Sequence, residues 1–252
     1  MRMSEILFKN ASIGYRGVPV LRAVSFTAEK GRITALIGPN GAGKSTVLKT
    51  AAGLLKPIEG RVCIRDRSIG SYSPKELYGI ISVMMTDRVK TKFMSCHDVV
   101  RVGRYRYTGI FGTLTQADRR VIRESMELIG VWDLRDRDYA ALSDGQQQRV
   151  LLARAIVSEP GILIMDEPAS FLDMGRKIEF FDALKGLVKE KDMTVLISMH
   201  EVEMVKKVAD KVICISASGG IDAKGAAEEL INPAYMEELF GMKKGRYEEY
   251  YG

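Results

Sequence analysis

One nine-residue stretch, GPNGAGKST at residues 38–46, constrains this chain more than any other feature. It fits the phosphate-binding pattern G-x-x-x-x-G-K-[ST], in which glycines let backbone amides approach a phosphate. Lys44 is expected to neutralise the β- and γ-phosphates, and the Ser45 hydroxyl to ligate Mg²⁺. Residues 32–37 are apolar enough for a buried strand, and residues 45–54 fit a helix whose positive N-terminus faces the phosphates. A glycine-rich turn without function is disfavoured by this context, so the pattern predicts an α/β fold that binds a nucleotide.

All nine residues of this stretch, the P-loop, are candidate nucleotide contacts. They are Gly38, Pro39, Asn40, Gly41, Ala42, Gly43, Lys44, Ser45 and Thr46.

The composition is that of an ordinary globular protein. The 252 residues are 46% hydrophobic and 28% charged, which is typical of folded domains. No stretch of about 18 apolar residues predicts a membrane span, and the N-terminus lacks the apolar core of a signal peptide. The three cysteines, Cys63, Cys96 and Cys214, are scattered and odd in number, which favours reduced thiols in the cytoplasm.

The order of the expected elements predicts one α/β domain with an inserted lobe. Residues 4–36 alternate as strands do, and residues 79–86 form an apolar run expected to be a buried strand. Residues 116–130 then have the spacing of an amphipathic helix. We predict a nucleotide-binding core with a β subdomain over residues 1–86 and 142–225, a helical lobe over 87–141, and a C-terminal helical extension over 226–252.

Two carboxylates and one histidine follow predicted strands. Asp166 and Glu167 end the apolar strand 161–165, and His200 follows the strand 192–199. Side chains at the C-terminal ends of parallel strands gather where α/β proteins bind their ligands. A loop start and a satisfied structural histidine are the alternatives, and the P-loop makes a role in handling Mg²⁺ and water the stronger hypothesis.

The sequence LSDGQ at residues 142–146 opens a long predicted helix that extends towards Pro160. Ser143 has the residue type of an N-cap, and a helix N-terminus presents free amides to an anion.

Five motifs occur in a fixed order along nearly the whole chain: the P-loop, LSDGQ at 142–146, ILIMDE at 162–167, SFLD at 170–173, and the late His200. Together they resemble the ATP-binding cassette of ABC transporters. The resemblance implies an α/β P-loop NTPase core with an N-terminal antiparallel β subdomain and an inserted α-helical subdomain. It also implies ATP hydrolysis with ATP and Mg²⁺ as cofactors.

The resemblance assigns a role to each candidate in the core. Tyr15 would stack on the adenine, and Asp166 would hold Mg²⁺ together with Ser45. Glu167 would be the catalytic carboxylate, assisted by His200 as the switch histidine and by Lys44.

The signature LSDGQ implies a second copy of the chain. In such cassettes Ser143, Gly145 and Gln146 would contact the γ-phosphate held by the other subunit, with Asp173 in the adjoining D-loop. Two copies would therefore sandwich two ATP molecules head to tail.

Two positions depart from the family pattern. Asp144 stands where the signature commonly has glycine, and we expect its carboxylate to face away from the triphosphate. Thr86 stands where the family has a glutamine; it is kept as a candidate Mg²⁺ ligand, although its hydroxyl has a shorter reach than a glutamine amide.

The segment 86–107 carries six basic and two acidic residues. A solvated face is the plain interpretation. In resembling importers this region forms the groove that receives a membrane subunit, so a docking surface that includes Arg101, Arg104 and Arg106 is the alternative hypothesis.

The leading interpretation is the ATPase subunit of an importer for iron-siderophore, haem or cobalamin. Its expected partners are integral membrane permease subunits and, indirectly, a substrate-binding protein, with no nucleic acid. Its expected location is the cytoplasmic face of the membrane. A soluble ATPase without a transport role, such as one for cluster assembly, is the alternative.

Overall fold

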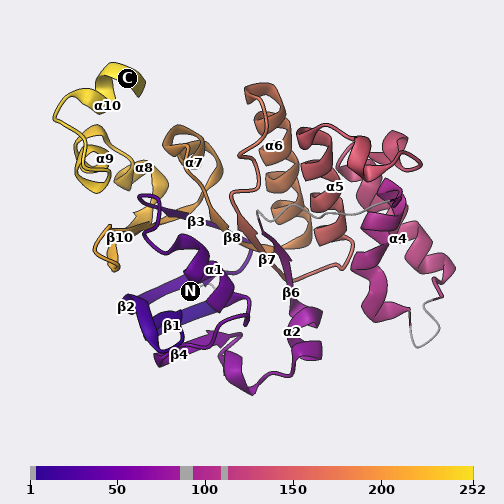
Figure 1. Ribbon diagram of the computed structural model, residues 1–252, viewed down its shortest axis with the longest axis horizontal. Helices are drawn as coiled ribbons and strands as arrows, with labels where there is room; N and C mark the ends of the chain where they lie inside the picture. The colour runs from indigo at the N-terminus through magenta and orange to yellow at the C-terminus, as the bar shows by residue number, and fades with distance from the viewer. Residues whose placement is uncertain (1–3, 86–92, 109–112, 252) are drawn as a thin grey trace.

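The computed structural model describes residues 4–85, 93–108 and 113–251, and within these ranges the chain forms two β-sheets with helices around them (Figure 1). The larger sheet has six strands in the order β10-β9-β3-β8-β7-β6. Their bounds are β3 Ile33–Ile37, β6 Ile81–Met84, β7 Ile162–Asp166, β8 Thr194–Ser198, β9 Lys211–Ile215 and β10 Ile221–Ala226. Only β10 runs antiparallel to its neighbour. The predicted α/β class is confirmed.

The smaller sheet is antiparallel, in the order β2-β1-β4-β5. It consists of β1 (Ser4–Tyr15), β2 (Val18–Glu29), β4 (Glu59–Ile64) and β5 (Arg67–Ser68). The turn between β1 and β2 spans only two residues, and alternating apolar side chains form the inner face of this sheet. This is the expected N-terminal β subdomain.

Helix α1 (Lys44–Ala51) covers one face of the six-stranded sheet. Because side chains alternate along a strand, Leu196 of β8 and Ile164 of β7 share a core with Leu48 of α1 and with the antiparallel sheet. The P-loop therefore leads from β3 into a helix that is buried between the two sheets.

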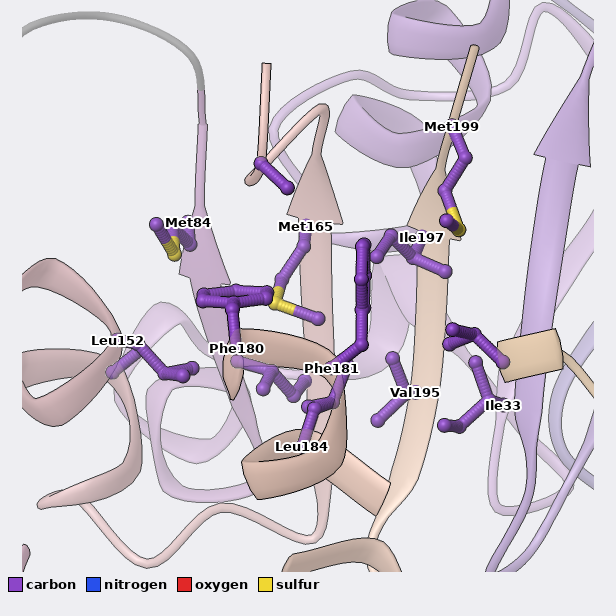
Figure 2. Close-up of a cluster of buried hydrophobic side chains, with 14 of the residues drawn as sticks. Ile33, Met84, Leu152, Met165, Phe180, Phe181, Leu184, Val195, Ile197 and Met199 are labelled. Atoms are coloured by element: carbon purple, nitrogen blue, oxygen red, sulfur yellow. The ribbon is translucent and has the colours of Figure 1, made fainter. Parts of the chain in front are cut away.

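Helices α5 (Asp144–Ile156) and α6 (Met174–Lys191) cover the opposite face. Figure 2 shows Phe180 and Phe181 of α6 pointing at β7 and β8, beside Met165 and Ile197. The two phenyl rings meet edge to face, with centroids 5.3 Å apart. This apolar layer fixes the strands whose ends carry the candidate site.

The described part of the helical lobe packs around α5. It contains α3 (Cys96–Arg101), η2 (Val102–Tyr107), α4 (Gln116–Leu128), η3 (Trp132–Leu134) and η4 (Tyr139–Ala141). Ser95 and Thr115 each cap a helix through a reciprocal capping box with an aspartate three residues later, so the starts of α3 and α4 are set locally. Helix α5 contacts both α3 and α4 and also β6.

Three sequence expectations need correction. The apolar run 79–86 is not one buried strand: residues 79 and 80 end helix α2 (Pro74–Ile80), and Val83 of β6 is exposed because β6 is an edge strand. Helix α5 ends at Ile156 rather than near Pro160. Leu128, one of the apolar residues that give the segment 116–130 its amphipathic spacing, is exposed at the end of α4.

The chain closes with short helices at one end of the molecule (Figure 1). They are α8 (Ala227–Leu230), α9 (Pro233–Leu239) and α10 (Arg246–Tyr251). Helix α7 (Val202–Val208) comes earlier, between β8 and β9, and η1 (Ile69–Ser71) precedes α2. Within the ranges described, no helix is long and apolar enough to cross a membrane.

Candidate functional site

The P-loop backbone can be made only with glycine at its key positions. Gly38, Gly41 and Gly43 have φ values of +148°, +80° and +102°, a region that side chains strongly disfavour. A Cβ on Gly43 would lie 2.2 Å from Leu21 Cδ1, whereas one on Gly41 would meet nothing within 4 Å. The loop is therefore closed on its protein side and open at Gly41, as a backbone cradle for a phosphate must be.

Lys44 begins α1 and is 5% exposed. Its ammonium donates to the carbonyl oxygens of Gly38 at 2.8 Å and Pro39 at 3.0 Å. Burial lowers the pKa of Lys44, while the charges of Glu167 and Asp166 oppose this shift. The positive charge is thus placed inside the P-loop and faces the carboxylate pair.

The start of α1 suits an anion and a hard cation. Its N-cap, Gly43, provides no side-chain hydrogen bond, and its first turn contains no acidic residue. The amides there are consequently not capped by a side chain of the N-cap residue. Ser45 in this turn and Asp166 on β7, against which α1 packs, both offer the oxygen ligands that Mg²⁺ prefers. The residues present fit a magnesium nucleotide.

Asp166, Glu167 and His200 come together at the C-terminal ends of β7 and β8. Leu163 and Met165 of β7 face α6, and side chains alternate along a strand, so the Asp166 side chain lies on the α1 side of the sheet, as Ile164 does. The Glu167 carboxylate (Oε1) makes a short contact with His200 Nε2, and its Oε2 accepts a hydrogen bond from the Ser170 hydroxyl at 3.3 Å. The predicted catalytic pair is therefore in direct contact.

Ser198 is a site residue to which the sequence reasoning gave no role. Its hydroxyl donates to Asp166 Oδ1 at 2.6 Å and accepts the backbone N–H of Glu167 at 2.9 Å. The available signal was a serine at the C-terminal end of the strand 194–198, whose central residues are apolar. Sequence spacing could not reveal its partners, which lie 31 and 32 residues away.

The signature residues lie on the face of the six-stranded sheet that is opposite α1. Ser143 is the N-cap of α5 and forms a capping box with Gln146, at 3.4 Å and 3.2 Å. A Cβ on Gly145 would meet Leu172 and Arg176 beside the D-loop, and Asp173 caps α6 by accepting the Arg176 amide at 2.9 Å. Because α1 and α5 cover opposite faces of one sheet, the structure does not join the signature to the P-loop within the chain.

Three further candidates differ in how the structure places them. Tyr15 ends β1 and is 43% exposed, and the following strand reaches the P-loop through Val20 and Leu21, which lie beside Gly43. Asp144 is exposed in the first turn of α5. Thr86 falls outside the described residues, as do Arg88, Lys90 and Lys92 of the basic segment.

Arg104 is not a surface cation, which corrects its inclusion in a docking face. Its side chain is 7% exposed, and Nη2 lies 2.7 Å from Asp118 Oδ1. Its Nη1 donates to Val157 O at 3.1 Å and to Glu159 Oε2 at 2.7 Å. Arg104 therefore links η2, α4 and the end of α5 inside the helical lobe.

The remaining part of that surface is a groove between β6 and the helical lobe, with a volume of about 440 Å³. Exposed apolar side chains line it, including Val102 and Tyr105, together with the Arg106 guanidinium, which donates to Tyr78 O at 2.9 Å. Met84, Met85 and Leu151 form apolar parts of its lining. This mixture of apolar and cationic groups is typical of a protein interface.

Comparison with known proteins shows which family this chain belongs to. The family model for ABC transporters matches residues 21–170, more than half of the chain. The chain belongs to the ABC transporter family. An uncharacterized ABC transporter ATP-binding protein of Methanocaldococcus jannaschii is 37% identical, covering 97% of this chain and 84% of that protein. The petrobactin import ATP-binding protein YclP of Bacillus subtilis is 33% identical, covering 93% of this chain and 92% of that protein.

A solved structure shows the same fold. An inward-facing ABC transporter assigned to the metal-chelate type superposes with a TM-score of 0.82 and 26% identity, covering 94% of this chain and 89% of that chain. As a member of the family, the chain binds a nucleotide and couples ATP hydrolysis to transport. A cassette without a transport role is not favoured, because these relatives are transport proteins.

Proposed function

We propose that the chain is the ATP-hydrolysing subunit of an importer for metal chelates of the siderophore class. The observation that carries this proposal is the similarity to YclP over 93% of the chain, since the match includes the helical lobe as well as the shared nucleotide core. The structural similarity to a transporter of the metal-chelate type supports the same substrate class.

The site geometry supports specific roles for this chain's residues in hydrolysis. Lys44 and the P-loop amides would hold the phosphates, and Ser45 and Asp166 would hold Mg²⁺, which supplies positive charge to the phosphate oxygens. Glu167 would orient the attacking water and accept its proton. His200, in contact with the Glu167 carboxylate, would keep that carboxylate in place.

The separation of α1 from α5 supports a dimer. Because each chain presents its signature away from its own P-loop, a second copy placed head to tail would bring Ser143 and Gly145 to the phosphates held by its partner. The capped start of α5 supplies backbone amides for this contact.

The groove between β6 and the helical lobe is the proposed seat of the membrane subunit. Val102 is 46% exposed and Tyr105 is 77% exposed at its rim, and burying such side chains against a partner helix is favourable. Met84 and Met85 in its lining directly precede Thr86 in the sequence, the position where the family has a glutamine.

The test is purification of the tagged chain from detergent-solubilised native membranes, followed by identification of what accompanies it. We expect a membrane protein with many spans, and ATP hydrolysis that is stimulated by a binding protein loaded with a ferric siderophore. Val102→Asp should release the chain from this complex. Leu128→Asp is the matched control, because Leu128 is similarly exposed at 44% on the same lobe but outside the groove.

Two results would contradict the proposal. Recovery of the chain without any membrane protein would contradict the transport role in this form. If free metal ions but no chelate stimulate ATP hydrolysis, the role in an importer would stand but the proposed substrate class would be wrong.

A further inference from the structure

Ser198 occupies the centre of the nucleotide site's supporting sheet. It ends β8, which lies between the P-loop strand β3 and the Asp166 strand β7. The parallel register pairs Ser198 with Asp166 on one side and with Leu36 on the other. Its side chain shares the α1 face with Leu196 and is completely buried. The sheet therefore brings one buried hydroxyl to the C-terminal ends of β3 and β7, which carry the P-loop and Asp166.

This hydroxyl both donates and accepts a hydrogen bond, and its two partners belong to Asp166 and Glu167. A serine hydroxyl has one proton to donate and two lone pairs that accept. The proton goes to Asp166 Oδ1 at 2.6 Å, and the oxygen accepts the Glu167 amide at 2.9 Å. A hydrogen bond to a carboxylate at this distance is a strong, charge-assisted one. The last residue of β7 and the residue that follows it are thus tied to one atom of β8.

The backbone at Glu167 needs such a contact. Its φ of +47° lies in the left-handed region, where the Cβ of a residue other than glycine is crowded and which persists only if the surroundings impose it. The Ser198 hydroxyl holds the amide of this residue, and His200, two positions further along the chain, contacts its carboxylate. Both ends of Glu167 are therefore anchored by the same end of β8.

We propose that Ser198 is a positioning residue for ATP hydrolysis. Its hydroxyl orients the Asp166 carboxylate and holds Glu167 in the left-handed conformation that directs its carboxylate to His200. This inference rests on the proposed roles of Asp166 and Glu167. A serine that merely satisfied its own hydrogen bonds in the core would contribute to stability but would not affect the two carboxylates selectively.

The chain offers a matched control on the same strand. Thr194 is also completely buried on β8, and within the described residues its hydroxyl has no hydrogen-bond partner. Thr194→Val removes a buried hydroxyl from β8 at the end remote from the site, whereas Ser198→Ala removes one at the site. Ser198→Thr keeps the hydroxyl and tests rescue. Ser198→Cys replaces the hydroxyl with a slightly larger thiol that hydrogen-bonds only weakly, and serves if the alanine variant does not fold.

The experiment measures kcat and KM for MgATP, the thermal midpoint without nucleotide, and amide hydrogen exchange at Glu167 in the nucleotide-free chain. For Ser198→Ala we expect kcat to fall about 10- to 100-fold, as displaced catalytic groups do, with KM changed less than about threefold. Exchange of the Glu167 amide should quicken about tenfold or more. Ser198→Thr should restore both, and Thr194→Val should alter neither.

Two results would overturn the inference: a normal kcat in both Ser198→Ala and Ser198→Cys, or equal losses in Ser198→Ala and Thr194→Val. Glu167→Gln distinguishes this failure from that of the proposed function. If Glu167→Gln still hydrolyses ATP at the normal rate, the proposed role of Glu167 is wrong; if it is inactive while the Ser198 variants are normal, only the positioning role of Ser198 is wrong.

Discussion

Replacing Arg104 with alanine should destabilise the helical lobe, although Arg104 belongs to a basic segment that suggests a solvated surface. Nε and Nη2 donate to Asp118 Oδ1 at 3.0 Å and 2.7 Å, and the guanidinium carbon lies 3.7 Å from the centroid of the Tyr107 ring. The side chains of Arg104 and Asp118 are only 7% and 4% exposed. Removing the guanidinium therefore leaves the Asp118 carboxylate buried without the positive charge of Arg104.

The size of the effect follows from which contacts survive. Breaking a buried ion pair from one side costs about 3–5 kcal/mol. Asp118 Oδ2 would keep its hydrogen bonds from Thr115, at 3.0 Å and 2.6 Å, and the half-exposed Glu159 can be hydrated. The lower end, about 3 kcal/mol, is therefore the expected loss of unfolding free energy. For a chain of this size it corresponds to a fall in Tm of roughly 6–12 °C.

The assay is thermal unfolding of the nucleotide-free chain, with Arg101→Ala as control. Arg101 carries the same charge in the same lobe and pairs with Asp98 at 3.3 Å, but its side chain is 49% exposed, so its loss should cost less than about 1 kcal/mol. Equal Tm values for the two variants would refute the assignment of Arg104 as a buried link.

A pH series provides an independent check. Hydrogen bonds from Thr115 and Arg104 hold the pKa of Asp118 below its ordinary value, although burial opposes them. In the wild type this stabilisation is present above the ordinary carboxylate pKa, about 3.9, and is lost as the pH falls through the lowered value. Without Arg104 the buried carboxylate binds a proton more readily, so the difference in stability between variant and wild type should shrink as the pH falls below the ordinary carboxylate pKa. A constant difference would indicate that lost packing dominates.

The remaining predictions concern the nucleotide site. Glu167→Gln should bind MgATP but turn over at least about a hundredfold more slowly, and size-exclusion chromatography with MgATP should show it as a dimer; a variant that binds ATP and stays monomeric would contradict the head-to-tail sandwich. Lys44→Ala should abolish hydrolysis, because a buried charge that faces the P-loop is lost, and a normal rate in a phosphate-release assay would contradict this. Tyr15→Ala should weaken ATP binding by about 1–3 kcal/mol through lost stacking, measured by titration calorimetry, and an unchanged Kd would remove the adenine contact from Tyr15.

Local sequence determined the nucleotide-binding element and much of the fold class. The P-loop needs glycine at Gly38 and Gly43 because both have a positive φ, which is a property of the local backbone. Strands such as 162–166 and 194–198 are apolar runs, and the helix starts at Ser95, Thr115 and Ser143 are set by side chains three residues apart. Interactions of this range leave a direct trace in the order of residues.

The tertiary structure alone decided the partners of Arg104 and Ser198. Arg104 and Arg101 are the same residue type three positions apart, yet one is buried, because Asp118 and Glu159 reach it from 14 and 55 residues away. Ser198 meets Asp166 only because the parallel register of β7 and β8 places them opposite each other. A shift of one residue in that register would turn the hydroxyl to the other face of the sheet. Such pairings depend on how distant elements pack, and local residue patterns do not encode that packing.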